Sequence, residues 1–293
     1  MPMKLFQKNP MLLLIVGVLG VSMSSILVRY SQAPSAVTAA YRLLWSALLL
    51  MPVALGKKAF RKELKQISLR MALLSILSGI CLAIHFVLWF ESLQHTSVAN
   101  STTIVCTDVI FVCLGYWLFL KGKLTSKALL AIGIMLTGSV LIALADAGSG
   151  GQLYGDILAL LAAIAIAAYT LIGTRVRAHL STTAYTFLVY SACATVLVVT
   201  CLVQGHSLVG FGWSPVIVGL MLAVFSTLLG HSLFSWCLKF YSPAFVSACK
   251  LCEPVVAALI AVPLFREIPQ PVQLCGSALI LGGVFWYSYM ENK

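Results

Sequence analysis

The sequence predicts an all-α membrane protein of ten transmembrane helices, arranged as two inverted five-helix repeats. Three observations predict this fold: the composition, a series of apolar runs of membrane-spanning length, and a weak internal repeat. The chain has 293 residues, of which 61% are hydrophobic and only 9% are charged, and its mean hydropathy is +1.02. A soluble fold does not need so apolar a composition, whereas an integral membrane protein does.

Ten apolar runs follow one another along the chain, each near the ~20 residues that a helix needs to cross a bilayer. The predicted spans cover residues 11–28, 36–55, 71–91, 97–119, 128–145, 153–173, 182–203, 214–237, 243–264 and 271–289. Lys4 and Lys8 before the first run are also typical of a secretory signal peptide. Because the internal repeat gives this run a partner in the second half, we interpret it as the first span.

The distribution of Lys and Arg predicts the orientation, since the cytoplasmic loops of membrane proteins carry an excess of these residues. With a cytoplasmic N-terminus, 15 of the 19 Lys and Arg fall in inside segments, Arg29 and Arg266 fall outside, and Arg42 and Lys250 lie within spans. We therefore expect a multi-pass protein of the plasma membrane with both termini in the cytoplasm. The basic loop at residues 56–70 is interpreted as lipid-facing, so the net charge of +11 does not indicate nucleic-acid binding.

The chain matches itself weakly when it is shifted by 145 residues, which predicts repeats at residues 1–147 and 152–293. With this shift Asp108, the one acid within the fourth predicted span, falls on Glu253 in the ninth. Each half holds five spans, an odd number, so the second half must enter the membrane in the opposite orientation. Inverted repeats of this kind are typical of secondary transporters, whose substrate binds near mid-bilayer where the repeats meet.

The middle of the ninth predicted span carries Lys250, Glu253 and Pro254. A charge at mid-bilayer costs at least ~2.5–3.5 kcal/mol, so an ionisable residue there marks a functional site by default. Lys250 and Glu253 are three positions apart, share a helical face and are expected to neutralise each other. Pro254 predicts a kink, because its missing N–H leaves the carbonyl oxygen of Lys250 without a helical partner. We interpret this helix as the border of a polar, substrate-sized cavity; a structural ion pair at a kink is the alternative.

Further candidates for substrate binding lie in other predicted spans. His85 and His231 differ by 146 positions, close to the repeat shift, and a histidine exchanges protons near neutral pH. They are candidates for substrate binding or proton coupling, with neutral histidines in helix interfaces as the alternative. Trp89 shares the helical face of His85 and is a candidate wall for a small organic or cationic substrate. Asp108 and Glu253 are candidate proton carriers.

Arg42 in the second predicted span is a candidate to attract an anionic substrate group. The alternative is a structural ion pair, for which Glu91 and Asp108 are the expected partners. The nine cysteines are scattered through the apolar runs, so we expect neither a disulfide framework nor a metal site. We expect no cofactor.

Three segments resemble signatures of the drug/metabolite transporter superfamily, specifically its EamA-type members. They are residues 251–260 (LCEPVVAALI), 264–268 (LFREI) and 41–47 (YRLLWSA). The resemblance covers essentially the whole chain, with two departures: Gly122 stands where the second half has Glu267, and Asp108 is not followed by proline. The resemblance implies a central cavity lined by spans 1–4 and 6–9, with spans 5 and 10 at the periphery.

From the repeat, the charges within the spans and the resemblance we expect a secondary transporter of a small metabolite, an amino acid or a related compound. Export is a frequent role of such families, and proton coupling, exchange and facilitation are all open. No P-loop pattern is present, so an ATP-driven pump is not expected. A membrane-embedded enzyme acting on a lipid and a passive channel are the alternatives. The expected partners are the substrate and membrane lipids, without nucleic acid, and a homodimer is left open.

Overall fold

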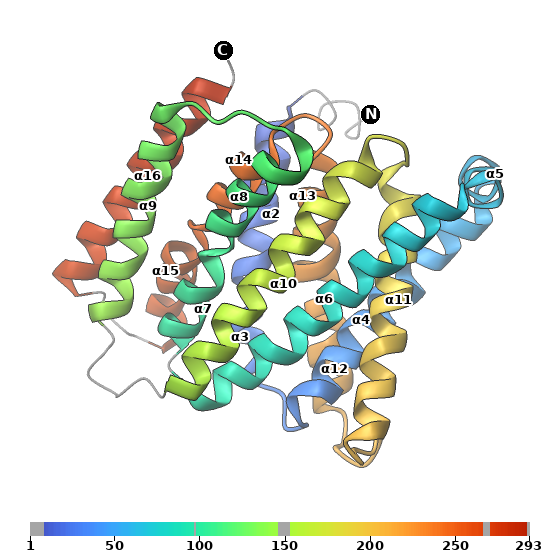
Figure 1. Ribbon diagram of the computed structural model, residues 1–293. Coiled ribbons are helices and arrows are strands. Elements are labelled where there is room, and N and C mark those ends of the chain that lie inside the picture. The colour runs from blue at the N-terminus through green and yellow to red at the C-terminus, as the bar shows by residue number, and fades with distance from the viewer. Residues whose placement is uncertain (1–8, 97, 146–152, 266–269, 292–293) are drawn as a thin grey trace.

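The computed structural model describes residues 9–96, 98–145, 153–265 and 270–291. Within these ranges the chain is helical, without strands. Its long helices form a bundle in which successive long helices run in opposite directions (Figure 1). Lys4, Lys8, residues 148–151 between the two predicted repeats and the signature residues Arg266 and Glu267 lie outside the described ranges.

The first half of the chain, in order, forms α2 (Pro10–Ser22), α3 (Ser24–Val28), α4 (Ser35–Gly56), α5 (Lys58–Gln66), α6 (Leu69–His95), α7 (Val98–Cys106), α8 (Asp108–Leu120) and α9 (Ser126–Ala145). The second half forms α10 (Leu153–Arg177), α11 (Thr182–Val203), α12 (Ser214–Met221), the π-helix η2 (Leu222–His231), α13 (Ser232–Cys237), α14 (Pro243–Lys250), α15 (Glu253–Phe265) and α16 (Pro271–Glu291).

Among the described residues, 9 helical segments are long and apolar enough to cross a membrane. They overlap nine of the ten predicted spans. The remaining predicted span, residues 243–264, is divided into the shorter helices α14 and α15. The chain is therefore a multi-pass membrane protein, while the count of ten spans stays a prediction.

The interruption between α14 and α15 lies just before Pro254. The N–H groups of Leu251 and Cys252 donate to the carbonyl oxygens of Ala248 and Cys249, three residues back, which tightens the last turn of α14. Pro254 then occupies the second position of α15, where its missing N–H costs no hydrogen bond. The helix is thus interrupted at the place where the sequence predicts a kink.

A second interruption, between α7 and α8, was not predicted from the sequence. The expected span at residues 97–119 is two helices that meet at Thr107, although no proline is present there. The Thr107 hydroxyl donates to the carbonyl oxygen of Ile104 at 2.6 Å and the Thr107 N–H donates to it at 3.0 Å. A hydroxyl that bonds a nearby carbonyl competes with the regular helical pattern. Shifted by 145 positions, α7 and α8 fall almost on α14 and α15.

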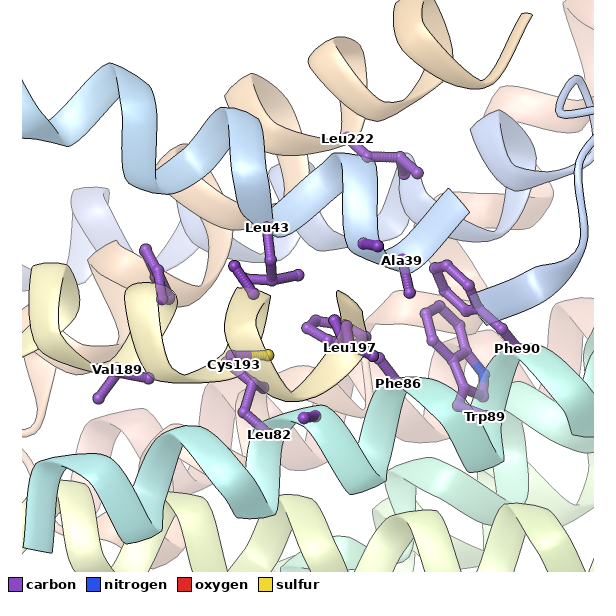
Figure 2. Close-up of a cluster of buried hydrophobic side chains, with 14 of the residues drawn as sticks. Ala39, Leu43, Leu82, Phe86, Trp89, Phe90, Val189, Cys193, Leu197 and Leu222 are labelled. Atoms are coloured by element: carbon purple, nitrogen blue, oxygen red, sulfur yellow. The ribbon is translucent and has the colours of Figure 1, made fainter. Parts of the chain in front are cut away.

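The buried core joins the two halves of the chain. Figure 2 shows Leu43 of α4, Leu82 of α6 and Leu197 of α11 packed together with Cys193, and all four side chains are fully buried. Phe86, Trp89 and Phe90 of α6 continue this apolar cluster (Figure 2). Because α4 and α6 belong to the first half and α11 to the second, this core fixes the two halves against each other.

The start of α2 and the end of α16 lie at the same end of the bundle. The Cys237 thiol at the end of α13 donates to the carbonyl oxygen of Pro10 at 3.6 Å, and Glu291 accepts from the Ser242 N–H at 2.9 Å. Figure 1 shows the start of α2, the end of α16 and the basic helix α5 at this same end. This arrangement agrees with the expected sidedness, and the orientation in the membrane stays a prediction.

Candidate functional site

A cavity in the middle of the bundle is lined by all seven residues that the sequence analysis singled out for substrate binding. They come from α4, α6, α8, η2, α14 and α15: Arg42, His85, Trp89, Asp108, His231, Lys250 and Glu253. The space open to the centre of a water molecule measures about 40 Å³, which holds a few waters. Among the described residues, α9, α11 and α16 contribute no lining side chain.

The Lys250 side chain pairs with Asp108 and not with Glu253, so the predicted Lys250–Glu253 neutralisation is wrong. The Lys250 Nζ contacts Asp108 Oδ2, to which the Ser247 hydroxyl also donates at 3.1 Å. The prediction assumed a continuous helix, but α14 ends at Lys250 and α15 begins at Glu253, so three positions no longer place these residues on one face. The observed ion pair connects the broken fourth helix of one half to that of the other.

Glu253 lies at the first residue of α15 and is buried. Within the described chain, the one hydrogen-bond contact of its carboxylate is a long one from the Cys106 thiol, which lies 4.0 Å from Oε2. Cys106 also lies 3.6 Å from the carbonyl oxygen of Lys250, the group that the helix break leaves free of a helical partner. A buried carboxylate without a cation in contact is energetically costly, so Glu253 is available to a positively charged ligand group.

Arg42 is the second charged group of the cavity lining without a partner of opposite charge in the described part of the chain. Its Nε donates to the Thr227 hydroxyl at 2.8 Å, its Nη1 donates to the Ser24 hydroxyl at 2.9 Å, and its guanidinium lies 4.2 Å from the ring centroid of Phe86. Neutral groups alone therefore hold a cation that is 1% exposed. A cation on an aromatic face gains ~2 kcal/mol or more when desolvated, less than the cost of burying the charge.

The expected ion pairs of Arg42 with Glu91 or Asp108 are wrong. Glu91 accepts from His95 Nε2 at 3.2 Å, one turn further along α6, and Asp108 is taken by Lys250. Instead, the π-helix η2 brings Thr227 to the guanidinium of Arg42, a contact between residues 185 positions apart that the sequence does not indicate. π-helical segments within α-helices are rare and are frequent at functional sites.

The two predicted histidines line the cavity within a group of aromatic rings. His85 Nδ1 lies 3.1 Å from the carbonyl oxygen of Ala162, which can only accept, so Nδ1 is the donor and, in the neutral ring, Nε2 is an acceptor. The His85 ring stacks on Trp89 at 5.8 Å between centroids. His231 meets the edge of Phe86 at 5.6 Å.

Two lining side chains have buried polar atoms without a hydrogen-bond partner in the described part of the chain. They are Nε1 of Trp89, which is a donor only, and Oγ1 of Thr102. Buried polar atoms are nearly always satisfied in folded proteins. Both atoms therefore point to a hydrogen-bonding occupant of the cavity.

Ser24, Cys106 and Thr227 contact the charged groups of the site although they were not predicted as site residues. A usable signal existed for Ser24, since residues 22–25 (SMSS) place three hydroxyls within an apolar span. No sequence signal distinguished Thr227, because its role depends on the π-helix. No sequence signal distinguished Cys106 among the nine cysteines; it packs in the buried core and also contacts Lys250 and Glu253.

Comparison with known proteins places both halves of the chain in one family. The profile of the EamA-like transporter family matches residues 8–144 and again residues 153–289. A protein of Archaeoglobus fulgidus described as an uncharacterized transporter is 25% identical over 261 residues, covering 86% of this chain and 87% of that one. A second uncharacterized transporter, from Clostridium kluyveri, is 23% identical over 253 residues, covering 84% and 81%.

A solved crystal structure of another protein shares the fold, with a TM-score of 0.78 over 97% of this chain and 98% of that chain. At 14% sequence identity this likeness concerns the fold alone. The family match extends over both halves and so over nearly the whole chain. The protein thus belongs to the EamA-like transporter family.

Proposed function

We propose that this protein is a secondary transporter that carries a small zwitterionic metabolite, an amino acid or a related compound, across the plasma membrane. The observation that carries this proposal is the pair of buried, opposite charges that line one cavity without ion-pair partners among the described residues, Arg42 and Glu253. A carboxylate suits the guanidinium, and an ammonium group suits the glutamate. The Trp89 N–H and the Thr102 hydroxyl supply further hydrogen bonds to the same ligand.

The proposed mechanism is alternating access between two inverted five-helix repeats, in ten spans with both termini in the cytoplasm. Both fourth helices of the repeats are interrupted beside the cavity, which suits the discontinuous helices at transporter midplanes. A volume that holds a few waters is too small for an amino acid, so binding requires the cavity to widen. The Asp108–Lys250 contact connects the halves across the cavity, and we propose that it breaks as the cavity opens.

A melting-temperature screen of the purified protein against a metabolite library tests the substrate class. A ligand present at 100 times its Kd stabilises the folded state by ~2.7 kcal/mol, which is readily measured. We expect an amino acid or similar zwitterion to raise the Tm of the wild type and to lose this effect in Glu253→Gln, because the amide no longer pairs with an ammonium group. Glu91→Gln is the matched control, since Glu91 contacts His95 outside the cavity.

The outcomes separate the possibilities. A ligand that stabilises the wild type and Glu253→Gln equally would remove Glu253 from the binding site while leaving the transport proposal intact. No stabilisation by amino acids, amines, nucleobases or sugars would contradict the proposed substrate class and favour a lipid-like substrate.

Coupling to protons is the proposed energy source, because Asp108, Glu253, His85 and His231 all line the cavity. In liposomes that contain the purified protein, we expect collapse of the proton gradient to reduce concentrative flux of the substrate identified by the screen. Flux that is unchanged by the gradient and by pH would instead indicate exchange or facilitation.

A further inference from the structure

A groove lies far from the central cavity, at the end of the bundle that carries α5. It is formed by α5, the first turn of α6 and the connection between α10 and α11, and its water-accessible space measures about 750 Å³. The side chains of Lys62, Arg70 and His179 line it together with apolar groups such as Ile67 and Met71. The groove is therefore both basic and partly apolar, and it joins segments of the two halves of the chain.

The one acid in the lining of this groove is already engaged. Glu63 accepts from the Ser181 backbone N–H and from the Ser181 hydroxyl, both at 2.6 Å. Ser181 is the N-cap of α11, so the carboxylate faces the positive end of a helix. The carboxylate of Glu63 is thus stabilised within the protein, and the side chains left for an anionic ligand are the cations Lys62 and Arg70.

The surroundings of the groove add further positive charge. Within residues 57–70 the chain carries Lys and Arg at six positions and Glu at one. Helix α5 lies across the bundle, seen end-on at the right of Figure 1, with Phe60 and Leu64 half-buried and the basic residues exposed. A polybasic amphipathic helix at the end of a membrane bundle attracts anionic lipid, with ~1 kcal/mol per basic side chain near the surface.

An apolar stripe on α6 begins at the groove. Leu69, Leu73, Ile76 and Leu77 are all exposed, with 74% exposure for Leu69 and 56% for Leu73. Their spacing places them along one side of the helix, where acyl chains of the bilayer contact the protein. A soluble anion would use the cations alone, whereas a phospholipid uses both the cations and this stripe.

We infer that this groove is a binding site for an anionic phospholipid. The lipid phosphate lies between Lys62 and Arg70, and the acyl chains run along the exposed face of α6. Because His179 and Leu180 of the groove belong to the second half, a bound lipid contacts both halves of the transporter. This inference depends on the membrane location of the chain and not on the substrate of the central cavity.

The test is a titration of the purified full-length protein in neutral detergent, with Tm as the readout. The probes are dioleoyl phosphatidylglycerol, dioleoyl phosphatidylcholine and inorganic phosphate. We expect phosphatidylglycerol to raise the Tm saturably, and the other two to have little effect. In the double variant Lys62→Gln/Arg70→Gln, the apparent Kd for phosphatidylglycerol is expected to rise about 30-fold, since ~1 kcal/mol per cation corresponds to about fivefold each.

The control Lys123→Gln/Lys127→Gln removes two exposed charges at the same end of the bundle, one between α8 and α9 and one in the first turn of α9. We expect this variant to bind phosphatidylglycerol within about twofold of the wild type. The charge-preserving variant Lys62→Arg/Arg70→Lys is expected to retain most of the affinity, which separates lost charge from a folding defect. Equal weakening in both charge-removing variants, equal stabilisation by phosphatidylcholine, or equal stabilisation by phosphate would each overturn the inference.

Discussion

Replacement of Asp108 by asparagine is expected to lower the free energy of unfolding by about 3 kcal/mol. Removing one partner of a buried ion pair costs ~3–5 kcal/mol, because the other charge is left buried without compensation. We expect the lower end of that range, since the Lys250 side chain keeps 12% exposure toward the cavity whereas Asp108 keeps 1%. Reversible unfolding in mixed micelles, followed by circular dichroism, measures the change.

The double variant Asp108→Asn/Lys250→Met distinguishes loss of the pair from loss of one residue. Replacing a buried ion pair by groups without charge is often neutral, so we expect the double variant to recover most of the stability lost in Asp108→Asn. If both variants were equally unstable, the contact between Asp108 and Lys250 would not be what stabilises this region.

The second large effect is expected at Gly138, where α9 crosses α16. A Cβ atom at Gly138 would lie 2.5 Å from the carbonyl oxygen of Gly276, and a Cβ at Gly276 would lie 2.6 Å from the carbonyl oxygen of Gly138. Small residues let membrane helices approach this closely. Gly138→Leu forces the backbones apart, so we expect a loss of about 3 kcal/mol, the upper end of the ~1–3 kcal/mol typical of overpacking.

Gly133→Leu provides the matched control on the same helix, because no atom of a neighbouring group lies within 4 Å of a Cβ at Gly133. The same unfolding assay is expected to find Gly133→Leu within about 0.5 kcal/mol of the wild type, as for surface positions in general. Neither α9 nor α16 contributes a described side chain to the cavity, so ligand affinity should persist in folded Gly138→Leu. Equal stabilities of the two leucine variants would contradict the proposed helix crossing.

The sequence predicted the position of most helices and offered seven candidate site residues that all line the cavity, and both follow from one cause. Burial of the chain in lipid requires long apolar helices, so runs of apolar residues reveal the spans, and an ionisable residue such as Asp108 or Arg42 stands out within them. The sequence did not predict which charge contacts which. The ion-pair partners depend on the direction in which side chains point after a helix is interrupted. Neither the interruption at Thr107 nor the π-helix η2 is marked by a strong local sequence signal.

The helix break at Pro254 also shows which features the sequence predicts and which it does not. Proline predicted an interruption, and the structure places one at residues 251–252. The neutralisation of Lys250 by Glu253 was inferred from regular helical spacing, and that spacing does not survive the interruption. A local signal thus located the break, while the partner of Lys250 came from α8, more than a hundred residues earlier in the chain.

The four charged side chains of the cavity also determine how the transporter responds to the membrane potential. With Arg42, Lys250, Asp108 and Glu253 ionised, the positive and negative charges of the lining cancel. A membrane potential of 100 mV contributes ~2.3 kcal/mol for each net elementary charge that moves across the membrane. The lining of the empty cavity has no net charge, so we expect the potential to have no such effect on it. The zwitterion that we propose as the substrate adds no net charge, so we expect its binding to leave the response to the potential unchanged. If protons are carried with the substrate, as we propose, we expect voltage dependence only in the step that carries the loaded site across the membrane. Each proton then adds one elementary charge to that step.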